Sequence, residues 1–192
     1  MAKKINKNWI IFGGIGLFVL IIIMWLAGTY NSLITLSETV DTSWAQVENQ
    51  YQRRADLIPN LVSTVKGYAA HEKDLFTEIT KLRSQWGAAA TKQGKIQAAQ
   101  GMEGAISRLL LVAENYPQLK ANENFLALQA ELSGTENRVA VERKRYNDAV
   151  RLYNIKIKRI PTVFIANWVG YEKAEYFEVE EGKEAVPEVD FN

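Results

Sequence analysis

The sequence contains no cysteine and a single histidine, His71. Without cysteine the chain can form no disulfide bond, no cysteine-ligated metal site and no lipid anchor on an N-terminal cysteine. His71 lacks obvious partners for a metal or for proton transfer, because the positions four residues away on either side are Gly67 and Leu75. Neither a G-x-S-x-G nucleophile motif nor a phosphate-binding glycine loop is present. We therefore expect a protein that is not an enzyme and that uses no cofactor.

Charge is missing from the whole segment Asn8 to Ser37. Within it, Trp9 to Ala27 is almost entirely hydrocarbon, and as a helix this run would be ~28 Å long, close to the ~30 Å core of a bilayer. A cleaved signal peptide would have a shorter apolar region, and cleavage at the end of this one would leave bulky Trp25 or Leu26 where a small residue is required. We predict a retained transmembrane helix over residues 9–29.

The basic residues lie unevenly around the predicted span. Lys3, Lys4 and Lys7 precede it, whereas the first Lys or Arg after it is Arg53. The positive-inside rule then places residues 1–8 in the cytoplasm and the remaining chain outside. We expect a single-pass protein of the inner (cytoplasmic) membrane, with its domain in the periplasm if the cell is Gram-negative.

Apolar residues after the predicted span recur with the period of an α-helix, and no segment alternates as a strand would. One stripe runs from Leu33 to Ile58 without an intervening Gly or Pro, so the span should continue directly into a long helix that ends near His71. A second, heptad-like stripe of the coiled-coil type runs from Phe125 to Ile157, and Pro161 ends it.

Two shorter helices, Glu72–Ala90 and Lys95–Glu114, are predicted between the stripes. The predicted fold is all-α: an N-terminal transmembrane helix continuous with an antiparallel bundle of two long and two shorter helices. The predicted domains are a cytoplasmic basic N-terminus (1–8), a transmembrane helix (9–29), an extracytoplasmic helical domain (30–177) and an acidic flexible tail (178–192).

Two segments of the chain resemble the LemA family. They are WAQVENQYQRRADLIPNLVSTVKGYAAHE, Trp44 to Glu72, and AENYPQLKANENFLALQAELSGTENRVAVERKRYNDAVRLYN, Ala113 to Asn154. The similarity extends over most of the chain, from Tyr30 to Phe177. The resemblance implies a bacterial protein with one N-terminal span and a helical domain, and it supplies no catalytic or binding residues.

A carboxylate interrupts the second apolar stripe at Glu142. An unpaired buried carboxylate is costly, so we expect a partner arginine from the first long helix, either Arg53 or Arg54. This candidate buried ion-pair network has two interpretations. It is a polar relay or ligand site, or it is an ion pair that sets the register of two helices, which is the interpretation we favour.

The segment around the helix-breaking Pro161 is basic and then aromatic. If the fourth helix returns to the membrane, this segment arrives near the lipid headgroups. It could then lie in the membrane interface, dock on a neighbouring subunit, or cap its own bundle. The candidate contact residues are Lys158, Arg159, Phe164, Ile165, Trp168 and Tyr171.

These observations predict a non-enzymatic, membrane-anchored helical scaffold or interaction protein of the bacterial envelope that assembles into a homo-oligomer. The alternative is a sensor or adaptor that presents its C-terminal tail to a membrane protease or kinase. Expected partners are membrane lipid, further copies of the chain and a membrane protein. Nucleic acid is not expected, because the basic residues belong to no recognisable nucleic-acid-binding motif.

Overall fold

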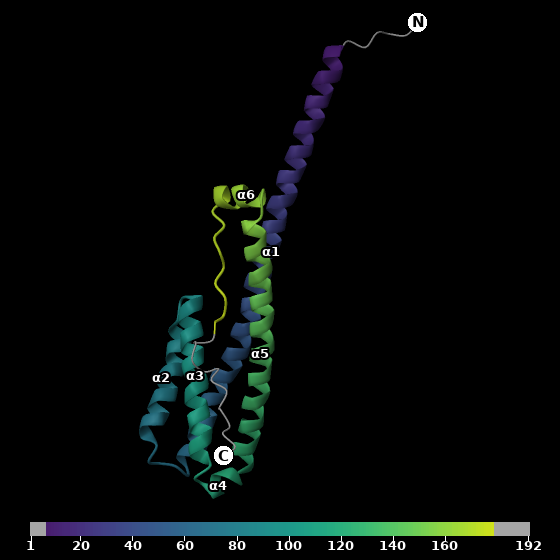
Figure 1. Cartoon of the computed structure of the whole chain (residues 1–192). Coiled ribbons are helices and arrows are strands. Elements are labelled where there is room, and N and C mark those ends of the chain that lie inside the picture. The colour runs from purple at the N-terminus through teal and green to yellow at the C-terminus, as the bar shows by residue number, and fades with distance from the viewer. Residues whose placement is uncertain (1–6, 179–192) are drawn as a thin grey trace, which may run out of the picture. The chain divides into compact units, whose positions relative to one another are not determined.

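The computed structural model of the chain describes residues 7–178, and these fold into helices without any strand (Figure 1). The predicted all-α fold, in which the apolar N-terminal segment is continuous with the first bundle helix, is confirmed. The helices are α1 (Lys7–Lys66), α2 (Lys73–Ala88), α3 (Lys92–Ala113), α4 (Pro117–Lys120), α5 (Glu123–Lys158) and α6 (Thr162–Val169).

Three details differ from the sequence prediction. Helix α1 ends at Lys66 instead of near His71, and a turn follows in which the N–H groups of Tyr68 and Ala69 both donate to the carbonyl of Val65. The short helix α4 was not predicted. It begins with Pro117, and proline is tolerated in the first turn of a helix because the N–H that it lacks would have no partner there. Helix α6 was not predicted; it lies in the segment that follows Pro161, beyond the end of the second stripe.

The helices belong to two compact units. Among the described residues, unit 1 comprises 7–43 together with 147–175, and unit 2 comprises 44–146 together with 176–178. Helices α1 and α5 each contribute to both units, whereas α2, α3 and α4 lie wholly in unit 2 and α6 in unit 1.

Unit 1 packs around residues 29–43 of α1. From residue 11 to residue 28 every side chain of α1 is exposed, and the first buried residues are Thr29 and Leu33. The described part of unit 1 offers only one other segment to cover them, the end of α5 with α6 and the extended chain that follows. The buried side chains on that segment are Ala149, Val150, Tyr153, Asn154, Ile157, Thr162 and Ala166.

The extended chain after α6 is tied to α5 by side-chain hydrogen bonds. The Asn154 amide donates to the carbonyl of Ala174 and accepts from the N–H of the same residue, both at 2.9 Å. The Tyr153 hydroxyl donates to the carbonyl of Glu172 at 2.8 Å. An extended segment outside a sheet has no neighbouring strand to bond its backbone N–H and C=O groups. The side chains of Tyr153 and Asn154 bond those groups instead and hold the segment along α5.

Unit 2 is a helical bundle whose core is formed by the parts of the two predicted stripes that lie within 44–146, together with α2 and α3, which pack against each other. Thr91 caps α3 by accepting a hydrogen bond from the N–H of Gly94 at 3.1 Å. The largest fully buried side chains of this unit are Tyr51, Ile58, Leu61, Ile79, Met102, Ile106, Leu109, Leu119, Leu132 and Tyr146.

Phe177 closes the core of unit 2. Its ring is stacked on Tyr51 at 6.1 Å between centroids and lies 6.5 Å from the ring of Trp44. The guanidinium carbon of Arg143 lies 4.3 Å from the Phe177 ring centroid, within cation–π range. The chain that reaches the C-terminal tail is therefore anchored in the bundle at this residue.

Candidate functional site

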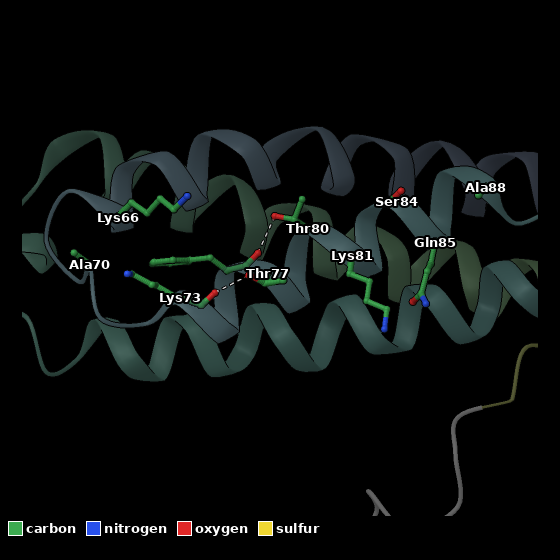
Figure 2. A pocket seen from close by; sticks show the side chains of 10 residues that line it. Lys66, Ala70, Lys73, Thr77, Thr80, Lys81, Ser84, Gln85 and Ala88 are labelled. Carbon is green, nitrogen blue, oxygen red and sulfur yellow. Dashed lines mark hydrogen bonds between the residues drawn. The ribbon is translucent and has the colours of Figure 1, made fainter.

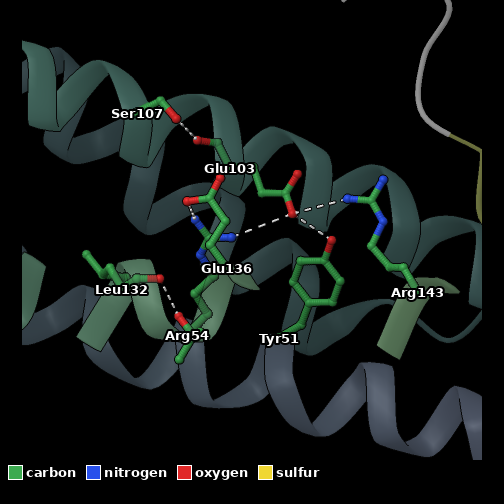
Figure 3. Close-up of polar contacts among 8 residues, drawn as sticks. Tyr51, Arg54, Glu103, Ser107, Leu132, Glu136 and Arg143 are labelled. Carbon is green, nitrogen blue, oxygen red and sulfur yellow. Dashed lines mark hydrogen bonds and ion pairs between the residues drawn. The ribbon is translucent and has the colours of Figure 1, made fainter. Parts of the chain in front are cut away.

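A polar cluster crosses the core of unit 2 and joins three helices (Figure 3). Tyr51 and Arg54 come from α1, Glu103 from α3 and Arg143 from α5. The Tyr51 hydroxyl donates to Oε1 of Glu103 at 2.7 Å. The same oxygen lies 3.6 Å from Nη1 of Arg54 and 3.6 Å from Nη1 of Arg143. One carboxylate oxygen thus holds all three helices.

The charges of this cluster are balanced within unit 2. Arg54 is only 2% exposed, and its second nitrogen, Nη2, lies 3.5 Å from Oε2 of Glu136. Two arginines therefore face two carboxylates, which offsets part of the cost of removing the guanidinium groups from water. Burial, together with the nearby Glu103 carboxylate, raises the pKa of Tyr51 far above its ordinary value.

The chemistry open to this cluster is limited. A phenol with a raised pKa is a poor acid near neutral pH, and the Glu103 oxygen that would accept a proton already faces three donors. The arrangement instead resembles an ion-pair network that fixes the register of three helices, although Nε and Nη1 of Arg54 make no hydrogen bond within the described residues. We therefore assign it a structural role.

The predicted network centred on Glu142 is rearranged in the structure. Glu142 pairs with Arg145 of the same helix at 2.7 Å, and its side chain remains 15% exposed. Arg53 pairs with Glu131 at 2.5 Å, and buried Arg54 pairs with Glu103 and Glu136. The physical reason is that α3 supplies a carboxylate to Arg54, while Glu142 reaches a basic partner one turn along its own helix.

Sequence reasoning missed Glu103 altogether. Its neighbours Met102 and Ile106 are buried members of the α3 stripe, so Glu103 lies at the edge of that stripe. The sequence did contain a signal for this pairing. Glu103 is a carboxylate at the edge of an apolar stripe, and Arg54 is an arginine next to the core position Ala55, so each needs a partner of opposite charge.

The residues predicted to contact a membrane or a subunit all lie in unit 1. Lys158 and Arg159 are exposed at the end of α5, and Phe164 and Trp168 are exposed on α6. Ile165 is half-buried. Tyr171 is also half-buried, with its ring 6.4 Å from that of Tyr153.

An open groove of about 950 Å³ lies beside α2 in unit 2 (Figure 2). Lys66, Lys73 and Lys81 line it with exposed ammonium groups. Its hydroxyls are already used, because Thr77 donates to the carbonyl of Lys73 and Thr80 donates to that of Phe76. Surface lysines without a buried polar partner do not make a built ligand site.

Within residues 7–178, no cluster of three or more His, Asp or Glu side chains is placed to hold a metal ion. His71 lies exposed in the turn between α1 and α2. Figure 1 shows the first part of α1 running alone, beyond α6 and the end of α5. By length and composition, α1 is the one described helix that could cross a membrane.

Together these features define a helical-bundle protein with a single N-terminal apolar helix, an arrangement that fits a single-pass membrane protein. The LemA family model matches residues 43–191, and the chain belongs to the LemA family.

The chain is similar to two magnetosome proteins and to a protein named LemA. Magnetosome protein MamQ 2 of Paramagnetospirillum magneticum is 29% identical over 176 residues, covering 78% of this chain and 64% of that protein. Magnetosome protein MamQ of Magnetospirillum gryphiswaldense is 26% identical over 174 residues, covering 77% of this chain and 64% of that protein. Protein LemA of Metamycoplasma hominis is 21% identical over 168 residues, covering 87% of this chain and 75% of that protein. The chain thus spans less than two thirds of the MamQ proteins.

Proposed function

We propose that this protein is a non-enzymatic, membrane-anchored scaffold of the bacterial cell envelope that assembles with further copies of itself. The observation that carries the proposal is the continuity of α1, which begins as an exposed apolar helix and ends in the core of unit 2. The charged groups of the polar cluster in unit 2 pair with one another, and the exposed apolar surface of α1 is the larger surface open to interactions.

Self-association is favoured by the anchor itself. Helices held in one membrane meet at a high effective concentration, which lowers the entropic cost of assembly. Gly13, Gly14 and Gly16 lie in open space on the apolar part of α1, with no atom within 4 Å of the position that a Cβ would occupy. Small residues of this kind allow two membrane helices to approach closely. We propose this glycine-rich stretch as the contact between neighbouring spans.

The mass of the complex extracted in mild detergent tests the proposal. The chain has a mass of 21.7 kDa, so an assembly of several copies is readily separated from a monomer by native mass measurement. Replacing Gly13 and Gly16 with Ile should reduce the assembly, whereas Gly87→Ile in unit 2, also in open space, should not. A monomeric parent protein in every mild detergent would contradict the scaffold.

For the orientation, we propose a cytoplasmic N-terminus and an external domain, on the basis of the three lysines that precede the apolar run. A protease added to intact spheroplasts should then digest the chain from Tyr30 onward. Protection of the domain in intact spheroplasts, with digestion after lysis, would show the opposite orientation.

An adaptor that presents its tail is the second candidate, and Phe177 favours it. That residue is buried among aromatic rings, so the acidic tail predicted for 178–192 would begin at a fixed point of the bundle. Residues 179–192 of this tail lie outside the described residues. An adaptor should purify as a small species that recovers a defined membrane protease or kinase, and deletion of 178–192 should abolish that recovery.

A further inference from the structure

Helix α6 exposes a continuous ridge of large apolar side chains. Ile160 precedes the helix across the cis Ile160–Pro161 peptide bond, and Phe164 and Trp168, four residues apart, lie on one face of α6. They are 80%, 68% and 88% exposed. The opposite face, with Thr162 and Ala166, is buried in unit 1. The helix is therefore packed on one side and left without a protein partner on the other.

Such a ridge is not ordinary surface. Single exposed apolar residues are common, but two large aromatic side chains on successive turns of one helix, preceded by the exposed Ile160, form a patch of the kind that marks an interaction site. Its aromatic members, Phe164 and Trp168, are two of the largest side chains available. The helix has firm boundaries, since Gly170 ends it with φ +88° and the N–H groups of Gly170 and Tyr171 both donate to the carbonyl of Ala166. The ridge is thus held in place.

The position of α6 within unit 1 identifies what covers the ridge. The apolar run of α1 ends at Ala27, and the first buried residue on α1, Thr29, comes only two positions later. The other described segment of unit 1 comprises the end of α5, α6 and the extended chain that follows. In Figure 1, α6 crosses the end of α5 next to α1. If Trp9 to Ala27 span a bilayer, α6 lies at the level of its surface.

The flanking residues match the same surface. Lys158 and Arg159 are exposed directly before the ridge and carry the charge that suits anionic lipid headgroups. On α1, Trp25 and Tyr30 are also exposed around the end of the apolar run. Aromatic side chains at this depth and cations beside them are typical of the membrane–water interface.

We propose that α6 lies in the plane of the membrane surface as a second membrane contact, with its ridge in the headgroup region and Lys158 and Arg159 on lipid phosphates. The inference rests on the proposed membrane anchor but not on self-assembly. The span and the interfacial helix then fix the orientation of unit 1 relative to the bilayer, because two separate contacts resist rotation of a single-span protein about its anchor.

Depth measurement with a fluorescent probe tests this inference. The chain has no native cysteine, so single cysteines can be introduced and labelled with an environment-sensitive nitrobenzoxadiazole group. Three labelled full-length variants are reconstituted in phosphatidylcholine–phosphatidylglycerol vesicles: Phe164→Cys in the ridge, Leu20→Cys in the apolar run, and Leu111→Cys in α3. Leu111 is a matched control, because it is 69% exposed and apolar but belongs to unit 2.

Nitroxide lipids, with the spin label near the headgroup, should quench the probe at Phe164 several-fold more than the probe at Leu111. Iodide in the water should quench them in the reverse order. The ridge proposal is overturned if the probe at Phe164 behaves like that at Leu111 while Leu20 is quenched by lipid. If the probe at Leu20 is also free of lipid quenching, the membrane anchor itself fails.

The remaining occupant, a second copy of the chain, gives a different result. The probe at Phe164 would then be shielded from both lipid and iodide, and it would regain iodide quenching when the protein is diluted into excess lipid. That outcome also overturns the proposal. Lipid quenching that persists on dilution, and that weakens when Lys158 and Arg159 are both replaced by Gln, supports it.

Discussion

Replacement of Glu103 by Ala is the sharpest test of the polar cluster in unit 2. The substitution removes the acceptor of the Tyr51 hydroxyl and the carboxylate that faces both Arg54 and Arg143. Stranding one member of a buried ion pair costs about 3–5 kcal/mol. Arg54 keeps Glu136 at 3.5 Å, and Arg143 keeps the Phe177 ring, so part of the charge remains compensated.

We therefore expect a loss of about 2–3 kcal/mol in the free energy of unfolding, below the full cost of an isolated buried charge. For a chain of this length, each kcal/mol moves the melting temperature by about 2–4 °C, so the shift should be about 4–12 °C. Circular dichroism of the full-length protein in detergent measures it. The mass of the assembly should not change, because the cluster lies inside unit 2.

Glu78→Ala is the matched control. Glu78 pairs with Arg108 across α2 and α3, as Glu103 pairs across helices, but both members of that pair are substantially exposed. Its loss should cost less than about 1 kcal/mol. If Glu103→Ala melts within experimental error of Glu78→Ala, the buried cluster does not stabilise the bundle and the structural role assigned to it is refuted.

Three further predictions concern residues around this cluster. Tyr51→Phe should cost about 1 kcal/mol at neutral pH by removing a buried hydrogen bond. Because the pKa of Tyr51 is raised in the folded state, the tyrosine contributes stability below its unfolded pKa of about 10 and loses it above that pH, so parent and variant should converge in alkaline melts. A gap that stays constant up to pH ~11 contradicts this sign. Gly104→Ala should raise the free energy of unfolding by about 0.5–1 kcal/mol, because its Cβ meets open space inside α3. Gly101→Ala should raise the free energy of unfolding less than Gly104→Ala, or lower it, since its Cβ would lie 2.7 Å from a leucine methyl of α2. Equal rises in melting temperature for the two variants would be evidence against that contact. Phe177→Ala should cost up to about 3–5 kcal/mol, whereas deletion of 178–192 should leave the melting temperature unchanged. Equal melts for these two variants would show that the aromatic anchor is not part of the packed core.

The long helices could be predicted from the sequence because burial of one helix face leaves a regular pattern. Leu33, Tyr51 and Ile58 of the first stripe are at most 1% exposed, and so is Leu132 of the second. Each turn of such a helix places an apolar residue on the buried face, so one polar residue in the series does not hide the pattern. The all-helical fold therefore follows from the spacing alone.

The partners of buried charges could not be predicted in the same way. The heptad pattern places Glu142 in the seam, but it does not determine which way the carboxylate turns, and Arg145 lies within reach on the same helix. The partner of Arg54 depends on where α3 lies against α1, which is a property of the packed bundle. Helix periodicity fixes a face, whereas ion pairing depends on the relative positions of neighbouring faces.

The packing of Phe177 and the helix α6 could not be predicted from periodicity either. Phe177 lies in a short extended segment with no periodicity, and its aromatic slot is built from residues far away in the sequence, Trp44, Tyr51 and Arg143. Helix α6 spans only Thr162–Val169, too short for a stripe to be recognised. Its composition nevertheless indicates a contact surface, because aromatic residues next to basic ones suit few environments other than a membrane interface or a protein partner.

Substitutions in the two units should therefore have different effects. In unit 2, polar side chains such as Glu103 and Arg54 form ion pairs with one another, so changing them should alter stability and leave the location of the protein unchanged. In unit 1, the exposed side chains of Phe164 and Trp168 contribute little to packing, so polar replacements there should leave the melting temperature unchanged and alter the membrane contact instead. Melting temperature and lipid contact, measured on the same set of variants, therefore report on the two units separately.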